Sequence, residues 1–129
     1  MTDSSVKLTL PAGTYWIGDP GYILSEEQYE QWLQEIEKGN EYDAVVIMNG
    51  YSFVTLSTML GDGYYKSNLR FKFGVDSGNL ACIPIGIVKQ PPHKHFVRRR
   101  TFKKAFKCFR TKKGMVHFGS VMIDTYPWQ

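Results

Sequence analysis

Short β-forming runs separated by glycine-containing turns are the feature that most limits how this chain can fold. The runs "AVVIM" and "YSFVTLST" flank Asn49-Gly50, a dipeptide that favours the two-residue turn of a β-hairpin. Similar turn signals occur at Gly61–Gly63, at Gly78-Asn79 and, as a three-residue loop, at Lys112–Gly114. The spacing of these turns predicts antiparallel strands in a mostly β protein.

Other strands are expected where apolar residues alternate with polar residues or form short runs. These segments are Val6–Leu10, Thr14–Asp19, Phe71–Gly78, Leu80–Val88 and the residues on both sides of Lys112–Gly114. The apolar residues between Phe102 and Arg110 fit helical spacing as well as strand spacing. The β-forming runs around the following loop favour a strand over Phe106–Thr111.

One segment, at about residues 25–38, has the features of an amphipathic helix. Ser25 and Gln28 have the spacing of a capping box, in which each side chain bonds to the other residue's backbone N–H. The apolar residues recur at helical spacing and are Tyr29, Trp32, Leu33 and Ile36. We therefore expect an α+β fold in one small domain over residues 1–129, with this single helix on a strongly bent antiparallel sheet or small barrel.

Charge is distributed very unevenly along the chain. The formal net charge of +4 combines −7 over residues 1–43, +1 over residues 44–88 and +10 over residues 89–129. Residues 89–114 contain eleven Lys and Arg side chains and no Asp or Glu. A surface selected only for solubility mixes both signs, whereas this one repels itself unless a polyanion or an acidic partner covers it.

The basic stretch 89–113 is therefore predicted to bind nucleic acid without reading its sequence, since arginine and lysine pair with phosphates. We expect a non-enzymatic, cationic binding protein. The residues expected to contact the partner are Lys94, Arg98, Arg99, Arg100, Lys103, Lys104, Lys107, Arg110, Lys112 and Lys113. Most of the interleaved phenylalanines are expected to point into the core.

Other partners fit the same charge. The basic stretch could dock on an acidic surface of a host protein and block it, or capture an anionic nucleotide signal. The acidic helix Glu26–Glu37 could pair with the basic stretch of a second copy and form a homo-oligomer. A buried aromatic anchor within the basic stretch would favour the protein partner.

Four stretches of the chain together resemble a known family. They are "GTYWIGDPGYIL" (13–24), "GDGYY" (61–65), "FGVDSGNLACIP" (73–84) and "FGSVMIDT" (118–125). They are similar to motifs of short uncharacterised bacterial and phage proteins whose start reads Gly-x-Tyr-x-Ile-Gly-Asp-Pro-Cys-Tyr. The resemblance implies a compact β-rich fold and a phage-type accessory role, without an assigned activity. Gly21 stands where the family has cysteine, and the basic stretch is stronger than the family requires.

Four aspartates lie near predicted strand ends, at Asp19, Asp62, Asp76 and Asp124. Carboxylates are ligands that Mg²⁺ and Ca²⁺ prefer, so a metal site would form if these ends converged. Aspartate beside glycine is also ordinary turn chemistry, because its carboxylate bonds to nearby backbone N–H groups. We expect the turn role and no metal, and the sequence leaves open whether the four side chains meet.

The remaining candidate residues lack the spacing of a catalytic or zinc site. His93, His95 and His117 have no matched cysteines, and Ser77 has no nucleophile elbow around it. We therefore expect no catalytic residue and no cofactor.

Cellular location is constrained by absent signals. No run reaches the ~18–20 apolar residues of a membrane span, and the N-terminus lacks the pattern of a secretory signal. We expect no membrane contact and a cytoplasmic location, in the host cytoplasm if a phage encodes the protein. Cys82 and Cys108 occur in apolar surroundings and are expected to be buried free thiols.

Overall fold

A computed structural model of the chain describes residues 3–4, 6–39, 43–92 and 94–126. Over these ranges the chain forms two helices, α1 (Pro20–Ile23) and α2 (Glu26–Gly39). The strands of the same ranges are β1 (Leu8–Leu10), β2 (Gly13–Gly18), β3 (Ala44–Met48), β4 (Tyr51–Ser57), β5 (Gly63–Ser67), β6 (Lys72–Val75), β7 (Asn79–Pro84), β8 (Arg98–Phe102), β9 (Phe106–Arg110), β10 (Met115–Phe118) and β11 (Val121–Asp124). The fold is mostly sheet, which agrees with the expected α+β class.

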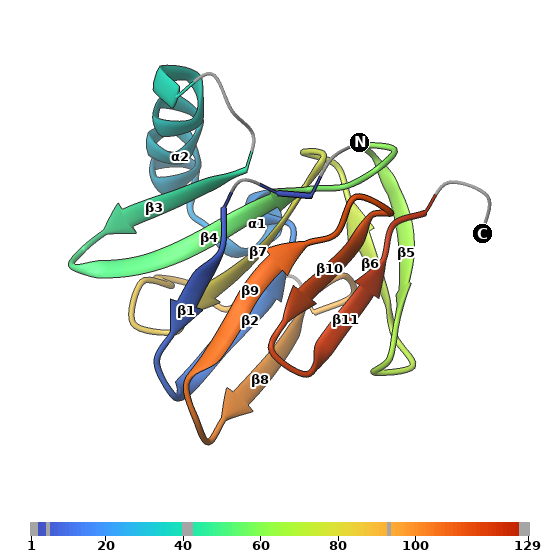
Figure 1. Ribbon diagram of the computed structural model, residues 1–129. Coiled ribbons are helices and arrows are strands. Elements are labelled where there is room, and N and C mark those ends of the chain that lie inside the picture. The colour runs from blue at the N-terminus through green and yellow to red at the C-terminus, as the bar shows by residue number, and fades with distance from the viewer. Residues whose placement is uncertain (1–2, 5, 40–42, 93, 127–129) are drawn as a thin grey trace.

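The strands form two antiparallel sheets rather than one (Figure 1). The six-stranded sheet has the order β1-β9-β10-β11-β5-β6, and the five-stranded sheet has the order β3-β4-β7-β2-β8. Neither sheet closes on itself, so the expectation of a single bent sheet or small barrel is wrong. The chain crosses between the sheets in short connections, as it does between β8 and β9, but over the described residues no ladder pairs an edge strand of one sheet with an edge strand of the other. The apolar faces of the sheets therefore stack without their edges joining.

Alternating side chains divide the interior into two cores. On β7, Leu80 and Cys82 face the six-stranded sheet, whereas Ala81 and Ile83 face the helices. Trp32 of α2 is buried in the second core, where its indole Nε1 donates to Thr55 Oγ1 at 3.1 Å. The molecule thus has three layers, in the order six-stranded sheet, five-stranded sheet and helices (Figure 1).

Both cysteines lie in the core between the sheets as free thiols, as expected. Burial and the neighbouring Cys108 thiol raise the pKa of Cys82, so this side chain stays protonated.

The predicted helix is confirmed as α2. Ser25 Oγ accepts from the backbone N–H of Gln28 at 3.2 Å, and Gln28 Oε1 accepts from the N–H of Ser25 at 3.1 Å. The capping box therefore forms. Helix α1 was not predicted, because "DPG" also has the composition of a turn. Asp19 caps this short helix and Pro20 occupies its first turn, where the missing N–H of proline costs nothing.

The glycine turns predicted most of the strand boundaries. Asn49 and Gly50 have φ values of 52° and 80°, as the tight turn of the β3–β4 hairpin requires. The ambiguous segment is a strand, β9, in agreement with the preferred interpretation. The run after Lys112–Gly114 is two strands instead of one, because Gly119, with φ of 60°, turns the chain back between β10 and β11.

Three features of the sheets differ from the sequence prediction. Strand β7 ends at Pro84 because the following residues form turns, with Ile87 N donating to the Pro84 carbonyl at 3.1 Å. Strands β5 and β8 were not predicted. Strand β8 consists mainly of arginine and lacks the apolar alternation by which a half-buried strand is recognised.

Candidate functional site

The basic stretch includes an edge strand. β8 is paired with β2 alone, so its other edge is open among the described residues. Arg98, Arg99 and Arg100 are all exposed, and they occupy three consecutive positions of this strand. Because side chains alternate along a strand, their charges project to both faces of the sheet edge.

The first of these arginines is held in place by its neighbours. The Arg98 guanidinium carbon lies 3.5 Å from the centre of the Phe71 ring, which is a cation–π contact. Its Nη1 also donates to the carbonyls of Lys94 at 3.3 Å and Val97 at 3.2 Å. The guanidinium is thus partly fixed while the residue stays exposed.

Two exposed lysines lie at the corner between β8 and β9, next to a cluster of buried aromatic rings. Phe102 and Phe106 stack with ring centres 3.7 Å apart and pack edge-on against Tyr15. These rings are buried, whereas Phe96 and Phe109 are partly exposed, so two of the four phenylalanines of this stretch lie in the core, where most were expected to do so. Lys103 and Lys104, which lie between them in sequence, are exposed.

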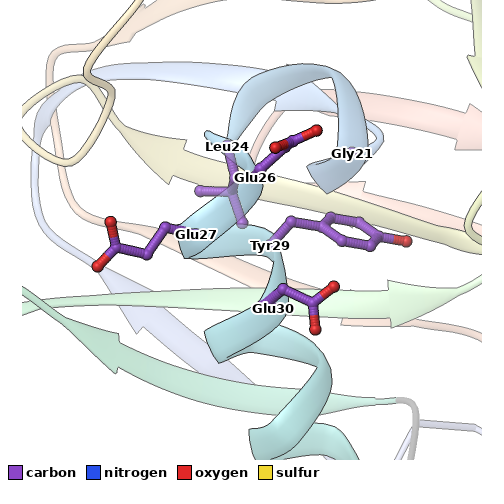
Figure 2. A pocket seen from close by; sticks show the side chains of 6 residues that line it. All are labelled: Gly21, Leu24, Glu26, Glu27, Tyr29 and Glu30. Atoms are coloured by element: carbon purple, nitrogen blue, oxygen red, sulfur yellow. The ribbon is translucent and has the colours of Figure 1, made fainter.

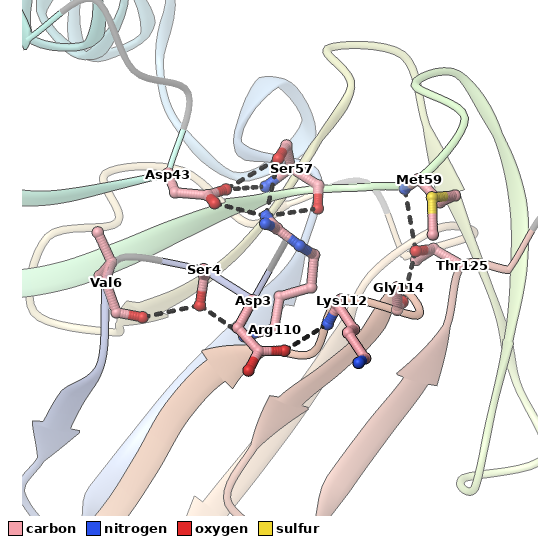
Figure 3. Close-up of polar contacts among 10 residues, drawn as sticks. All are labelled: Asp3, Ser4, Val6, Asp43, Ser57, Met59, Arg110, Lys112, Gly114 and Thr125. Carbon is pink, nitrogen blue, oxygen red and sulfur yellow. Dashed lines mark hydrogen bonds and ion pairs between the residues drawn. The ribbon is translucent and has the colours of Figure 1, made fainter. Parts of the chain in front are cut away.

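The two cations of strand β9 lie on opposite faces of the sheet. Lys107 is exposed, whereas Arg110 is buried and points inward. Arg110 Nη1 lies 2.5 Å from Asp43 Oδ2 and donates to Ser57 Oγ at 2.9 Å (Figure 3). The prediction that Arg110 contacts a partner is therefore wrong, because its charge is already used inside the fold.

The N-terminal segment is fastened to the same region (Figure 3). Ser4 Oγ accepts from the Arg110 backbone N–H at 2.9 Å and donates to the Val6 carbonyl at 2.9 Å. Asp3 Oδ1 accepts from the Lys112 backbone N–H at 2.6 Å. The side chains of Lys112 and Lys113 remain exposed on the turn between β9 and β10.

Nine of the ten predicted residues are therefore exposed, and we call this set the basic face. It consists of Lys94, Arg98, Arg99, Arg100, Lys103, Lys104, Lys107, Lys112 and Lys113. Within the described ranges, no member of the basic face forms an ion pair with a carboxylate. Lys112 and Lys113 lie at the opposite end of β9 from Lys103 and Lys104, so the set extends along the strand rather than forming one point of charge.

Asp19 makes structural hydrogen bonds. It is buried, and its two carboxylate oxygens accept from the backbone N–H groups of Gly21 at 2.7 Å, Asp76 at 2.6 Å and Ser77 at 2.8 Å. The carboxylate thereby ties α1 to the loop between β6 and β7.

The other three aspartates line surface pockets in pairs. Asp62 and Asp76 line one pocket of about 250 Å³, and Asp62 and Asp124 line another of about 400 Å³. The Tyr22 hydroxyl donates to Asp76, and this hydrogen bond, together with burial and the nearby carboxylates, raises the pKa of Tyr22 to about 12. Over the part of the chain that the structure describes, no group of three or more His, Cys, Asp or Glu side chains is placed to hold a metal.

The two described histidines and Ser77 lie in different loops and strands. His93 lies outside the described residues, His95 is exposed, and His117 lies on β10. Burial lowers the pKa of His117, which keeps the ring neutral at pH 7. Ser77 Oγ accepts from the Asn79 backbone N–H at 3.2 Å, which is a turn contact.

A pocket of about 750 Å³ lies at the start of α2. Its lining residues are Gly21, Leu24, Glu26, Glu27, Tyr29 and Glu30 (Figure 2). Three glutamates at the mouth repel phosphate groups. This pocket therefore gives no support to the capture of an anionic nucleotide.

Comparison of the chain with protein-family models, with curated proteins and with solved structures finds no match. The family resemblance of the four motifs stays a prediction, and the function has to be inferred from the geometry of the site. Neither helix in the described ranges is both long enough and apolar enough to cross a membrane.

The sequence prediction missed the outward side chains of the six-stranded sheet. Phe109 and His117 face each other across β9 and β10, with ring centres 4.5 Å apart and planes within 10°. Both rings are partly exposed. Their signal was present in the alternation of "FKCFR" and "MVHF", where they occupy the positions opposite to the buried ones.

Proposed function

We propose that the protein binds nucleic acid through the basic face, without reading its sequence and without catalysing a reaction. The observation that supports this best is β8, an open edge strand with three consecutive exposed arginines and no ion pair to any of them among the described residues. Unneutralised charges at this density repel one another, and phosphates would relieve that repulsion.

The residue types suit phosphate in particular. The planar guanidinium of arginine donates two parallel hydrogen bonds to one phosphate group, while lysine adds charge over a longer range. The side chains of Arg99 and Arg100 project from opposite faces of the sheet edge, so a flexible nucleic-acid strand can contact both. Contacts of this kind position a nucleic acid and carry no sequence information. A phage-type accessory role, as the motif resemblance implies, is part of the same proposal.

Charge reversal at one matched pair of positions tests the proposal. Arg99→Glu and Lys38→Glu change the net charge equally, but Lys38 pairs with Glu35 on α2, a helix that carries no residue of the basic face. We expect Arg99→Glu to weaken binding of a labelled DNA or RNA oligonucleotide at 50 mM salt, and Lys38→Glu to leave it nearly unchanged. The triple variant Arg98→Glu, Arg99→Glu, Arg100→Glu should abolish binding, as measured by fluorescence anisotropy.

Three outcomes would contradict the proposal. Equal losses in Arg99→Glu and Lys38→Glu would mean that only the total charge matters, and undiminished binding by the folded triple variant would exclude β8. If the wild-type protein binds no oligonucleotide at all, the basic face has another ligand. An acidic protein surface would then be the candidate to test by pull-down.

A further inference from the structure

The outer face of the six-stranded sheet is uncovered over β9, β10 and β11, in contrast to that of the five-stranded sheet, whereas at β6 the Phe96 ring packs on Gly74 and beside Tyr64. The helices pack on the five-stranded sheet, and no described helix lies over the front of β9, β10 and β11 (Figure 1). Alternate residues of these strands, such as Cys108, Val116 and Val121, are buried between the sheets. Their neighbours in sequence must therefore point outward to solvent.

We call this outer surface the open sheet face and define it by six outward side chains. They are Lys66, Lys72, Lys107, Phe109, His117 and Met122. All six are exposed or partly exposed, and the Met122 side chain is 38% exposed. Two aromatic rings, one methionine and three lysines thus share one accessible surface.

An aromatic pair occupies the middle of this face. Phe109 and His117 are opposite each other in the β9–β10 ladder, and their nearly parallel rings lie 4.5 Å apart. Met122 is opposite His117 in the next ladder. Because burial lowers the pKa of His117, the pair is uncharged at neutral pH. An uncharged, partly exposed aromatic surface suits the flat face of a nucleobase.

Lysines flank the aromatic pair on both sides. Lys107 lies two positions from Phe109 on the same strand, and Lys66 and Lys72 are opposite each other in the β5–β6 ladder. The one acidic side chain that alternation places on this face within the described strands is Asp124, which is in register with Lys66. The cations are therefore spaced across the face, as a chain of phosphates requires.

We infer that the open sheet face is a base-stacking surface and that the ligand of this protein is a single-stranded nucleic acid. The inference rests on the proposed function, since Lys107 belongs both to the basic face and to the open sheet face. The phosphates run along the basic face, and unpaired bases stack on Phe109 and His117. A duplex conceals the faces of its bases and cannot make this contact.

Substitution of Phe109 separates stacking from charge. The probes are a labelled single-stranded oligonucleotide and the duplex formed with its complement, at several salt concentrations. Phe109→Ala is expected to weaken single-strand binding by ~5–150-fold, the range for the loss of one stacked base. The slope of log affinity against log salt should stay unchanged, because no phosphate contact is removed. Duplex binding should be weaker than single-strand binding in the wild type and insensitive to the substitution.

Two further variants keep the experiment decisive. Phe109→Leu preserves an apolar contact with His117 and thus the fold, but it cannot stack, so the same loss of single-strand binding is expected. Tyr51→Ala removes an aromatic ring that is 45% exposed on β4 of the other sheet, and it should bind as the wild type does. Thermal unfolding of each variant shows that the protein measured is folded.

The outcomes distinguish this inference from the proposed function. If folded Phe109→Leu binds the single strand with wild-type affinity, or if the wild-type protein binds duplex and single strand equally well, the stacking inference is wrong. The proposal that the basic face binds nucleic acid would still hold. Absence of any wild-type binding at 50 mM salt would overturn the proposed function, and the stacking surface with it.

Discussion

Arg110 and Lys107 both belong to β9, but strand alternation places them on opposite faces. The outward lysine is available to a ligand, whereas the inward arginine meets Asp43 and Ser57. A charge taken out of water must be paired and hydrogen-bonded, and the geometry around Arg110 meets both requirements. Residue type alone therefore does not decide which cations of the basic stretch can bind a partner.

Removing the negative charge of the Arg110–Asp43 pair should destabilise the fold without weakening ligand binding. In Asp43→Asn the buried guanidinium of Arg110 loses its counter-charge, and we expect a loss of roughly 3 kcal/mol in the free energy of unfolding. Urea denaturation measures this loss, with Asp62→Asn as the control, since Asp62 is exposed. A change below about 1 kcal/mol, the usual size for surface pairs, would contradict the structural role.

At the level of elements, the helix α2 depends on a cap that the sequence specifies. Ser25→Ala removes the acceptor for the Gln28 N–H, so we expect a loss of about 1 kcal/mol in stability. Gln34→Ala is the matched control, because Gln34 is exposed within the same helix and alanine favours helix. Thermal denaturation compares the two variants. An equal effect of both substitutions would show that the capping box does not stabilise α2.

Elements with a strong local signal were predictable, and elements that depend on distant partners were not. Asn49-Gly50 and the Ser25–Gln28 pair determine a hairpin and a helix start through contacts within a few residues. Strand β8 has no such signal, because arginines at an edge need no apolar alternation. Its position beside β2 follows from long-range pairing.

The candidate site was predictable in part for the same reason. Charge counting located nine residues that the structure places at the surface, but it could not show that Arg110 turns inward. The stacked pair of Phe109 and His117 was not predicted, because it depends on the register of β9 with β10. Cross-strand register is set by the whole sheet and is not contained in either run of residues.

For the molecule as a whole, the layered architecture separates the two signs of charge. The acidic residues of α2 lie on the helix side of the five-stranded sheet. The basic face lies on β8, at the edge of that sheet, on β9 of the six-stranded sheet and on the adjoining turns. Self-association between the acidic helix of one copy and the basic face of another stays a prediction. Such pairing would compete with nucleic acid, because both partners would use the same cations.

The most direct test of the central claim is the salt dependence of oligonucleotide binding by the wild-type protein. If about six residues of the basic face contact phosphates, log affinity for a single strand should fall with log salt at a slope of about −4. Fluorescence anisotropy between 50 and 200 mM salt measures this slope. A steep slope of that size would agree with phosphate contacts along β8 and β9. A nearly flat slope, or no binding at 50 mM salt, would contradict the account.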